Sequence, residues 1–320
     1  MKLNPDLFTD KVKKEATRIG FGLGLVAAAR ADKNVVALTA DLAASTALGD
    51  FIKEFPERFI QVGVAEQNLA AVASGLAHVG KIPFATSFSM FNPGRNWEQI
   101  RTTIGYNNQP VKIVGTHSGL GVGEDGATHQ ALEDIAITRV IPGMVVLSPC
   151  DAIQAKQATI AAAKTASPTY LRLNRQRVPT IFSEDTSFEI GKAQLVRDGK
   201  DVTIIAAGPM LYPALVAAEE LGKEGISAAV INMHTIKPLD SRAIVTAARK
   251  TGRIVTVEDH QIHGGLGSAV AEVVVQECPV PMNILGMPDK YGESGHVEQL
   301  FVKFGLTEKE IAQMCRVLLR

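Results

Sequence analysis

Short apolar runs rich in β-branched residues alternate with segments of helical period along the first half of the chain. The runs have the length and composition of buried strands, and they lie at 35–41, 81–88, 111–117, 144–150 and 169–175. Helical periods fall between them, at 11–31, 66–79, 95–105 and 151–165. Such an alternation predicts a mainly parallel sheet with helices on both sides.

The alternation stops at 176–192, QRVPTIFSEDTSFEIGK, which holds a proline, an acidic pair and no sustained period, as is typical of a linker. It then resumes, with predicted strands at 201–208, 227–235, 253–259 and 282–287 and predicted helices at 211–224, 240–250, 266–276 and 307–319. We therefore expect an α/β protein of two domains, 1–185 and 186–320, each with a mainly parallel sheet flanked by helices. A chain of 320 residues is long enough for two such cores.

The composition narrows the function classes. Hydrophobic residues make up 46% of the chain and charged residues 21%, while Lys plus Arg and Asp plus Glu number 33 each. Without a basic excess, nothing supports nucleic-acid binding, and no apolar run is long enough to span a bilayer. The N-terminus lacks the apolar core of a secretory signal, and Cys150, Cys278 and Cys315 are too widely spaced for a metal site. We expect a cytoplasmic protein.

A glycine-rich segment, GLGVGEDGATHQ at 119–130, follows a predicted strand. Gly121, Gly123 and Gly126 match the spacing G-x-G-x-x-G of dinucleotide-binding loops. That motif needs a helix directly after its glycines and an acidic residue about twenty positions further on, and the sequence shows neither. Because open α/β sheets bind ligands at the carboxyl ends of their strands, a substrate loop is the favoured interpretation.

A second glycine run, HGGLGS at 263–268, lies between a predicted strand and a predicted helix. It could form an anion-binding helix N-terminus or a tight turn that needs positive φ, and we favour the turn.

Several ordered motifs resemble those of one enzyme family. They are ATR (16–18), ADLAAS (40–45), GVAE (63–66), TSFSMF (86–91), GEDGATHQ (123–130) and NRQ (174–176). Together they resemble the C-terminal half of transketolase, a thiamine-diphosphate enzyme with GEDGPTHQ and SRQ as the last two segments. The resemblance spans residues 16 to about 177 and continues more loosely beyond. It implies a pyrimidine-binding domain followed by a transketolase C-terminal domain.

The resemblance implies a set of cofactor residues. Glu66 is similar to the carboxylate that activates thiamine diphosphate through its aminopyrimidine ring, and a helix N-terminus would stabilise its charge. Phe88 and Phe91 resemble the aromatic residues that line and stack on that ring. Asp41 is a further candidate, reaching the cofactor across a subunit boundary. One departure concerns Gly94, which stands where the family has a tyrosine.

The resemblance also implies substrate residues. Four positions match those that bind sugar phosphates at the channel mouth, and arginine suits that task because its planar fork meets two phosphate oxygens. They are Arg18, Ser45, His117 and Arg175. Asp125 would bond a hydroxyl of the donor sugar, and His129 would act in catalysis by assisting proton transfer at the reacting oxygens.

The family's diphosphate-binding and metal-binding domain has no counterpart in this sequence, whose GED segment belongs to the substrate loop. The resemblance therefore implies the C-terminal subunit of a split transketolase, with no metal ligands of its own. Such a subunit would pair with an N-terminal subunit in an α2β2 heterotetramer, and the Mg²⁺ ligands would lie on that partner. The reaction would transfer a two-carbon ketol unit from a ketose phosphate to an aldose phosphate.

Three alternatives stay open. VEDHQIHGGLG (257–267) resembles deoxyxylulose phosphate synthase and the β subunits of 2-oxoacid dehydrogenases more than it does transketolase. A non-catalytic subunit of such a complex is the second alternative, although Glu66, Asp125 and His129 argue against it. A dehydrogenase using the 119–130 segment is the third.

Overall fold

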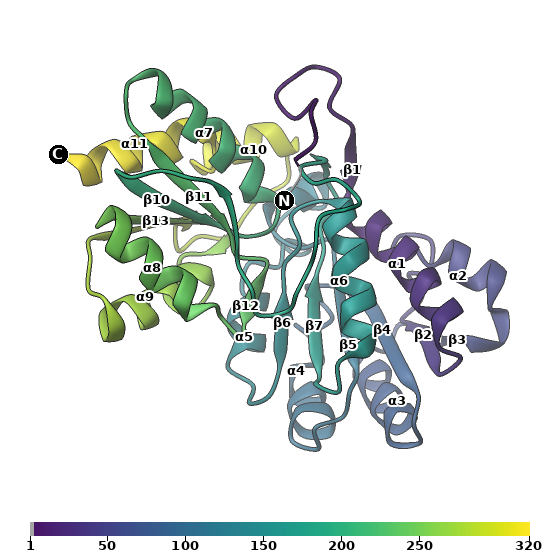
Figure 1. The fold of residues 1–320 in the computed structure, drawn as a ribbon. Coiled ribbons are helices and arrows are strands. Elements are labelled where there is room, and N and C mark those ends of the chain that lie inside the picture. Colours follow the sequence, from purple (N-terminus) through teal and green to yellow (C-terminus); the bar gives the residue numbers. More distant parts are fainter. Residues whose placement is uncertain (1–2) are drawn as a thin grey trace.

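The computed structural model describes residues 3–320, so the first two residues of the expected first domain lie outside it (Figure 1). Seven strands form the larger sheet, in the order β12-β6-β7-β5-β4-β2-β3. Their bounds are β2 (Val35–Thr39), β3 (Phe59–Gln61), β4 (Ile82–Phe88), β5 (Lys112–Thr116), β6 (Val145–Leu147), β7 (Thr169–Arg172) and β12 (Thr235–Lys237). All neighbours pair in parallel except β12, which pairs antiparallel with β6.

Helices cover both faces of this sheet. α1 (Thr17–Ala31), α2 (Gly49–Glu54) and α6 (Ala152–Lys164) share one apolar cluster with the strands. α3 (Glu66–His78), α4 (Trp97–Gln99) with the π-helix Ile100–Gly105, and α5 (Asp134–Arg139) belong to the other side. Every residue of β2 and β5 is buried, as expected of parallel strands covered on both faces.

The helix predicted over 11–31 is too long. Lys14–Ala16 forms strand β1 instead, and it pairs antiparallel with β8 (Arg177–Pro179) from the predicted linker. Residues 11–15 carry only Val12 as a large apolar residue, so no apolar stripe extends the helix in that direction.

Five strands form the second sheet, in the order β14-β13-β10-β11-β9. They are β9 (Gln194–Arg197), β10 (Val202–Ala206), β11 (Ala228–Asn232), β13 (Ile254–Gln261) and β14 (Met282–Met287), and only β9 runs antiparallel. α7 (Leu211–Lys223) and α11 (Glu308–Leu319) cover one face, while α8 (Ser241–Thr251) and α9 (Leu266–Glu277) cover the other (Figure 1). The expected α/β class, with two mainly parallel sheets flanked by helices, is confirmed.

The two sheets are tied together by β12, which comes from the second half of the chain but extends the first sheet. Lys237 at its end donates from Nζ to the carbonyl oxygens of Arg139 and Ile141, at 2.8 and 2.6 Å. One apolar cluster accordingly contains both Val146 of β6 and Ile231 of β11. The two halves therefore share a core.

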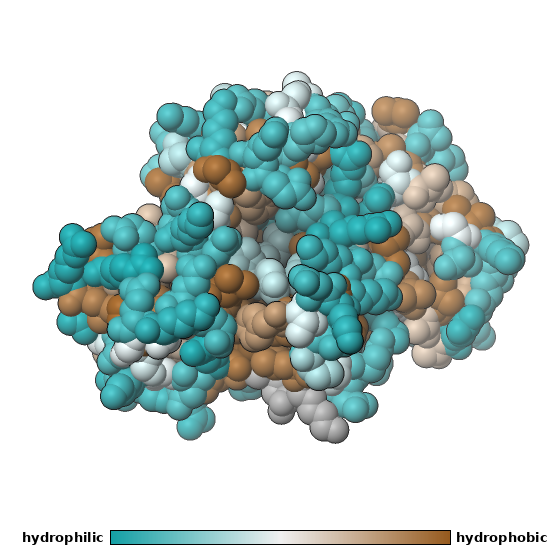
Figure 2. Space-filling view, turned by 90° about the horizontal axis from the view of Figure 1, so that it is seen from above, coloured by the Kyte–Doolittle hydropathy of each residue, from teal (hydrophilic) through white to brown (hydrophobic). Residues whose placement is uncertain are grey.

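The surface is mainly hydrophilic, with large hydrophobic side chains scattered over it, as Figure 2 shows for one face. No helix in the described chain has the length and apolarity to cross a membrane. Cys150, Cys278 and Cys315 are free thiols.

Candidate functional site

The predicted site residues gather at the carboxyl ends of the parallel strands of the larger sheet. Phe88 ends β4, His117 follows β5, and Arg175 lies three residues beyond β7. Glu66 opens α3, which follows β3. This is the edge at which open α/β sheets place their ligands.

Glu66 is a buried carboxylate with defined partners. Its side chain is 2% exposed, and Oε2 lies 2.8 Å from Nη1 of Arg95. The Ser87 hydroxyl donates to Oε1 at 3.4 Å, and the Asn96 amide donates to the Glu66 carbonyl oxygen at 2.9 Å. Helix α3 adds the partial positive charge of its N-terminus. Together these groups hold a negative charge at a fixed place inside the protein.

Four rings at the site contact one another. Phe88 and Phe91 are stacked, with centroids 6.3 Å apart and an interplanar angle of 23°. The His117 ring lies 3.9 Å from Phe88, and the His129 ring meets the edge of Phe91 at 5.5 Å. The structure thus brings the predicted aromatic residues beside both predicted histidines.

Arg95 was not identified from the sequence, yet it connects the carboxylate to the rings. Its guanidinium carbon lies 4.5 Å from the Phe91 centroid while Nη1 binds Glu66. The signal is its position four residues after Phe91, because in this turn Arg95 N–H donates to the Phe91 carbonyl and places the two side chains together.

Gly94, the departure from the family pattern, has no space for a side chain. A Cβ atom there would lie 2.0 Å from the carbonyl oxygen of Met90. The ring that the family carries at this position is therefore excluded, and the neighbouring Arg95 covers Phe91 instead.

Two arginines, Arg18 and Arg175, lie close enough to His117 for their charges to act on it. Arg18 donates to the Ser45 carbonyl oxygen, so Ser45 contributes its backbone rather than its hydroxyl. Burial lowers the pKa of Arg18, and the nearby charge of Arg175 lowers it further. The two arginines line a cavity of about 440 Å³ whose other charged residues are Lys13, Lys14, Arg177 and one acid, Glu15. Such an arrangement favours binding of an anion.

His117 is held neutral in this setting. Burial lowers its pKa to about 3, with smaller contributions from the charges of Arg18, Arg175 and His129. Its Nδ1 lies 3.0 Å from the Thr116 hydroxyl.

The glycine-rich segment contacts both Arg175 and the rings. Asp125 Oδ2 lies 3.6 Å from Nη1 of Arg175, and the same arginine nitrogen donates to the Val122 carbonyl at 2.6 Å. His129 contacts the Thr128 hydroxyl through Nδ1 at 3.0 Å. One segment thus presents an acid and a histidine to the rings and the cations.

Asp41 is not brought into this group. It is exposed, adopts φ of +63°, and its contacts are with Gln61, whose Oε1 accepts from the Asp41 N–H at 2.8 Å. The predicted role of Asp41 at a subunit boundary stays a prediction.

The geometry does not support the dinucleotide alternative. Leu120–Asp125 forms short 3₁₀ turns with a kink at Gly123, and the next helix begins only at Asp134 and has six residues. The second glycine run forms a turn before α9, whose Leu266 and Gly267 amides donate to the Glu258 carboxylate at 2.6 and 2.8 Å. The group bound at that helix N-terminus is therefore the protein's own carboxyl side chain.

Comparison with known proteins agrees with this geometry. Residues 13–180 match the model for "Transketolase, pyrimidine binding domain", and residues 191–311 match that for "Transketolase, C-terminal domain". The chain belongs to the transketolase family. The family generally uses thiamine diphosphate and a divalent metal. Among residues 3–320, no group of three or more His, Cys, Asp or Glu side chains is arranged to hold a metal ion.

Relatives of similar length match nearly the whole chain. The chain is 46% identical to a putative transketolase C-terminal section of Methanocaldococcus jannaschii, covering 92% of this chain and 94% of that protein. It is 42% identical to one subunit of an apulose-4-phosphate transketolase of Phocaeicola vulgatus, over 93% and 96% of the two chains. A solved structure described as "Split gene transketolase, inactive beta4 tetramer" superposes with a TM-score of 0.90 at 46% identity, covering 95% of this chain and 98% of that one.

Proposed function

We propose that this chain is the C-terminal subunit of a split transketolase, which transfers a two-carbon ketol unit from a ketose phosphate to an aldose phosphate. The observation that carries the proposal is the joint placement of a buried carboxylate, stacked aromatic rings and converging cations at one sheet edge. A carboxylate beside aromatic rings fits an aminopyrimidine, and paired arginines fit a sugar phosphate.

The cofactor half of the site would be formed by Glu66, Phe88 and Phe91. When bound, thiamine diphosphate supplies the carbon nucleophile to which the ketol unit is transferred. Glu66 offers a buried charged oxygen as hydrogen-bond partner for the pyrimidine, and the phenylalanine rings fix the plane of that ring. Because Arg95 binds the same carboxylate, the pyrimidine must share Glu66 with Arg95 or displace it.

The substrate half would be formed by the cations and the glycine-rich segment. Arg18 and Arg175 would bind the phosphate, with the Ser45 carbonyl holding Arg18, and His117, neutral at pH 7, would donate an N–H bond. Asp125 would accept from a sugar hydroxyl. His129, whose ring lies against Phe91, would move a proton at a reacting substrate oxygen.

An N-terminal subunit would complete the enzyme. One relative is named as a C-terminal section and another as a transketolase subunit, and the superposed structure is described as an inactive tetramer of β chains. These names support an α2β2 assembly, which we expect in the cytoplasm, with the Mg²⁺ ion and the cofactor diphosphate held by the partner. The chain by itself would then be inactive.

The test is ketol transfer from xylulose 5-phosphate to ribose 5-phosphate with thiamine diphosphate and Mg²⁺, on this chain alone and mixed with the candidate N-terminal subunit. Activity in the mixture only is expected. A second donor set follows from two relatives, which are named for 6-deoxy-6-sulfo-D-fructose and for apulose 4-phosphate. A stable complex without activity on any of these donors would overturn the proposed reaction, as would turnover by the chain alone.

The 2-oxoacid dehydrogenase alternative rests on the resemblance of the segment 257–267. This segment lies in the second sheet and the turn before α9, where Glu258 binds the helix amides. Decarboxylation of pyruvate without a sugar acceptor would favour that alternative.

A further inference from the structure

The glycine-rich segment 119–130 rests on the second domain along its length. The Leu120 N–H donates to Oδ1 of Asp259 at 2.8 Å, and the Gln130 side chain donates to the Glu293 carbonyl oxygen at 3.0 Å. Between these points, Glu124 Oε1 lies 3.4 Å from Nδ1 of His296. The first contact is buried and the second is partly buried, whereas the third lies on the surface.

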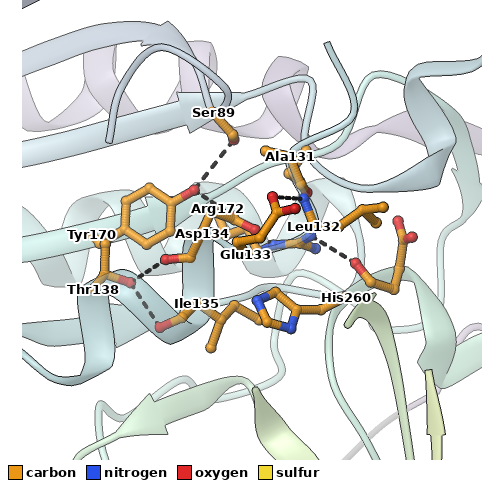
Figure 3. A network of polar contacts seen from close by, with 12 residues as sticks. Ser89, Ala131, Leu132, Glu133, Asp134, Ile135, Thr138, Tyr170, Arg172 and His260 are labelled. Atoms are coloured by element: carbon orange, nitrogen blue, oxygen red, sulfur yellow. Dashed lines mark hydrogen bonds and ion pairs between the residues drawn. The ribbon is translucent and has the colours of Figure 1, made fainter. Parts of the chain in front are cut away.

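Asp259 is itself fixed by a buried network that joins the domains. Arg172 of β7 donates from Nη2 to the Asp259 carbonyl oxygen at 2.7 Å and from Nε to Asp134 Oδ2 at 2.8 Å. Asp134 also accepts from the Tyr170 hydroxyl at 2.6 Å, and His260 lies close to this group (Figure 3). Arg172 donates to the Asp259 backbone carbonyl and not to its carboxylate. The carboxylate is therefore free to accept from the backbone of segment 119–130.

The segment is shaped for this contact at Gly119. This residue has φ of +72° and ψ of −168°, a backbone conformation that residues other than glycine rarely adopt. A Cβ atom there would lie 2.0 Å from Oδ2 of Asp259. The backbone at Gly119 therefore lies so close to the Asp259 carboxylate that no side chain fits between them.

We propose that Asp259 is a positioning residue, by which the second domain anchors the start of segment 119–130 and thereby sets the places of Asp125 and His129. The contact acts through a side-chain oxygen that accepts a backbone N–H. It requires an acceptor at position 259 and no particular charge. The effect on catalysis rests on the proposed function, whereas the effect on the segment does not.

Hydrogen–deuterium exchange of the chain alone tests the anchoring directly. In Asp259→Ala, amides in peptides covering 119–126 should exchange about tenfold faster or more, because local opening no longer breaks a buried hydrogen bond. Asp240→Ala is the matched control. Asp240 also accepts from two second-domain backbone amides, those of Ala243 and Ala193, both at 3.0 Å, but it does not touch the segment. Its peptides over 119–126 should exchange as in the wild type.

Two further variants separate anchoring from general packing. Asp259→Leu fills the space without an acceptor and should behave like the alanine variant, and it serves if that variant does not fold. Asp259→Asn keeps an oxygen and should restore slow exchange. Unchanged exchange in a folded Asp259→Ala or Asp259→Leu chain would overturn the proposal, as would equal acceleration in Asp259→Asn.

In the assembled enzyme, Asp259→Ala should raise KM for the ketose donor about tenfold, with a smaller change in kcat, because the donor hydroxyl meets a displaced Asp125. If the wild-type assembly catalyses no ketol transfer, that result counts against the proposed function. The exchange experiment would still test the anchoring. Faster exchange with unchanged KM and kcat would show that the anchoring has no role in positioning.

Discussion

At the scale of single residues, the role of Glu66 distinguishes an enzyme subunit from a non-catalytic one. Its burial beside Arg95 and the stacked rings has a physical cost that a surface acid would not carry, which indicates a use for the charge. Glu66→Gln keeps the shape and removes the charge. We expect kcat of the assembled enzyme to fall by about 10²–10⁴-fold, the range of general acid–base effects.

Glu98→Gln is the control for this measurement, since Glu98 is an exposed acid on the neighbouring α4. It should leave kcat unchanged. Full activity of Glu66→Gln in a complex that carries thiamine diphosphate would contradict the proposed role and support a non-catalytic subunit.

His117 makes the folded state sensitive to acid. Its pKa is lowered to about 3 in the folded protein and returns to its ordinary value of 6.5 on unfolding. Below pH 6.5 the unfolded chain therefore binds a proton that the folded chain does not, and stability is lost as pH falls from 6.5 towards 3. Between pH 7 and pH 5 this difference amounts to about 2 kcal/mol.

Urea unfolding of wild type and His117→Gln at pH 7 and pH 5 measures this effect. His234 and His260, whose pKa values burial lowers to about 4, remain in both proteins and cancel in the comparison. The wild type should lose about 2 kcal/mol more than the variant between the two pH values. Equal losses would show that His117 is protonated in the folded chain.

At the scale of secondary-structure elements, the sequence predicted the buried strands well because they are continuous apolar runs. The strands at 35–41, 81–88 and 111–117 are observed as β2, β4 and β5 with shorter ends. β3, β8, β9 and β12, each of three or four residues, were missed because so few positions show no period. β6 and β7 are equally short but lie inside longer apolar runs, and they were predicted. The short helices α2, α5 and α10 (Val297–Lys303) were missed for the same reason.

The sequence predicted which residues belong to the candidate site, but it did not predict the contacts between them. Phe88, His117 and Arg175 each end or follow a strand that the apolar pattern reveals. Glu66 follows β3, which was missed, and it was found from its motif and from the helix predicted at 66–79. Arg95 has no such motif. Its role depends on the turn after β4, whose course is set by packing that the sequence does not display.

That turn gives a prediction at Gly94. Gly94→Ala would place a methyl group against the Met90 carbonyl, so the turn must move and take Phe91 and Arg95 with it. We expect a loss of about 1–3 kcal/mol in the free energy of unfolding, measured in urea. Gly49→Ala is the control, because its Cβ meets nothing within 4 Å at the start of α2. It should be neutral or stabilising, and a similar loss in both variants would refute the steric argument.

At the scale of the whole molecule, the expected domain boundary at 185 lies in a stretch of linker composition, but strand pairing and the apolar core both cross it. The linker composition of 176–192 was visible, but β12 crosses from the second half into the first sheet. Such a pairing joins segments about ninety residues apart, and a three-residue strand carries no signal of its partner. The sequence therefore predicts two sheets and does not reveal that they share a core.

This shared core predicts that the first half does not fold alone. A fragment of residues 1–190 would expose the edge of β6, remove the Lys237 contacts to Arg139 and Ile141, and leave Arg172 without the Asp259 carbonyl. Exposed strand edges and buried donors that lose their acceptor both destabilise a fold. The fragment should unfold without a cooperative transition or aggregate, whereas the full chain should show a single transition by circular dichroism in urea. A fragment with a cooperative transition at a similar midpoint would mean that β12 and the buried network add little, and that the halves are independent domains.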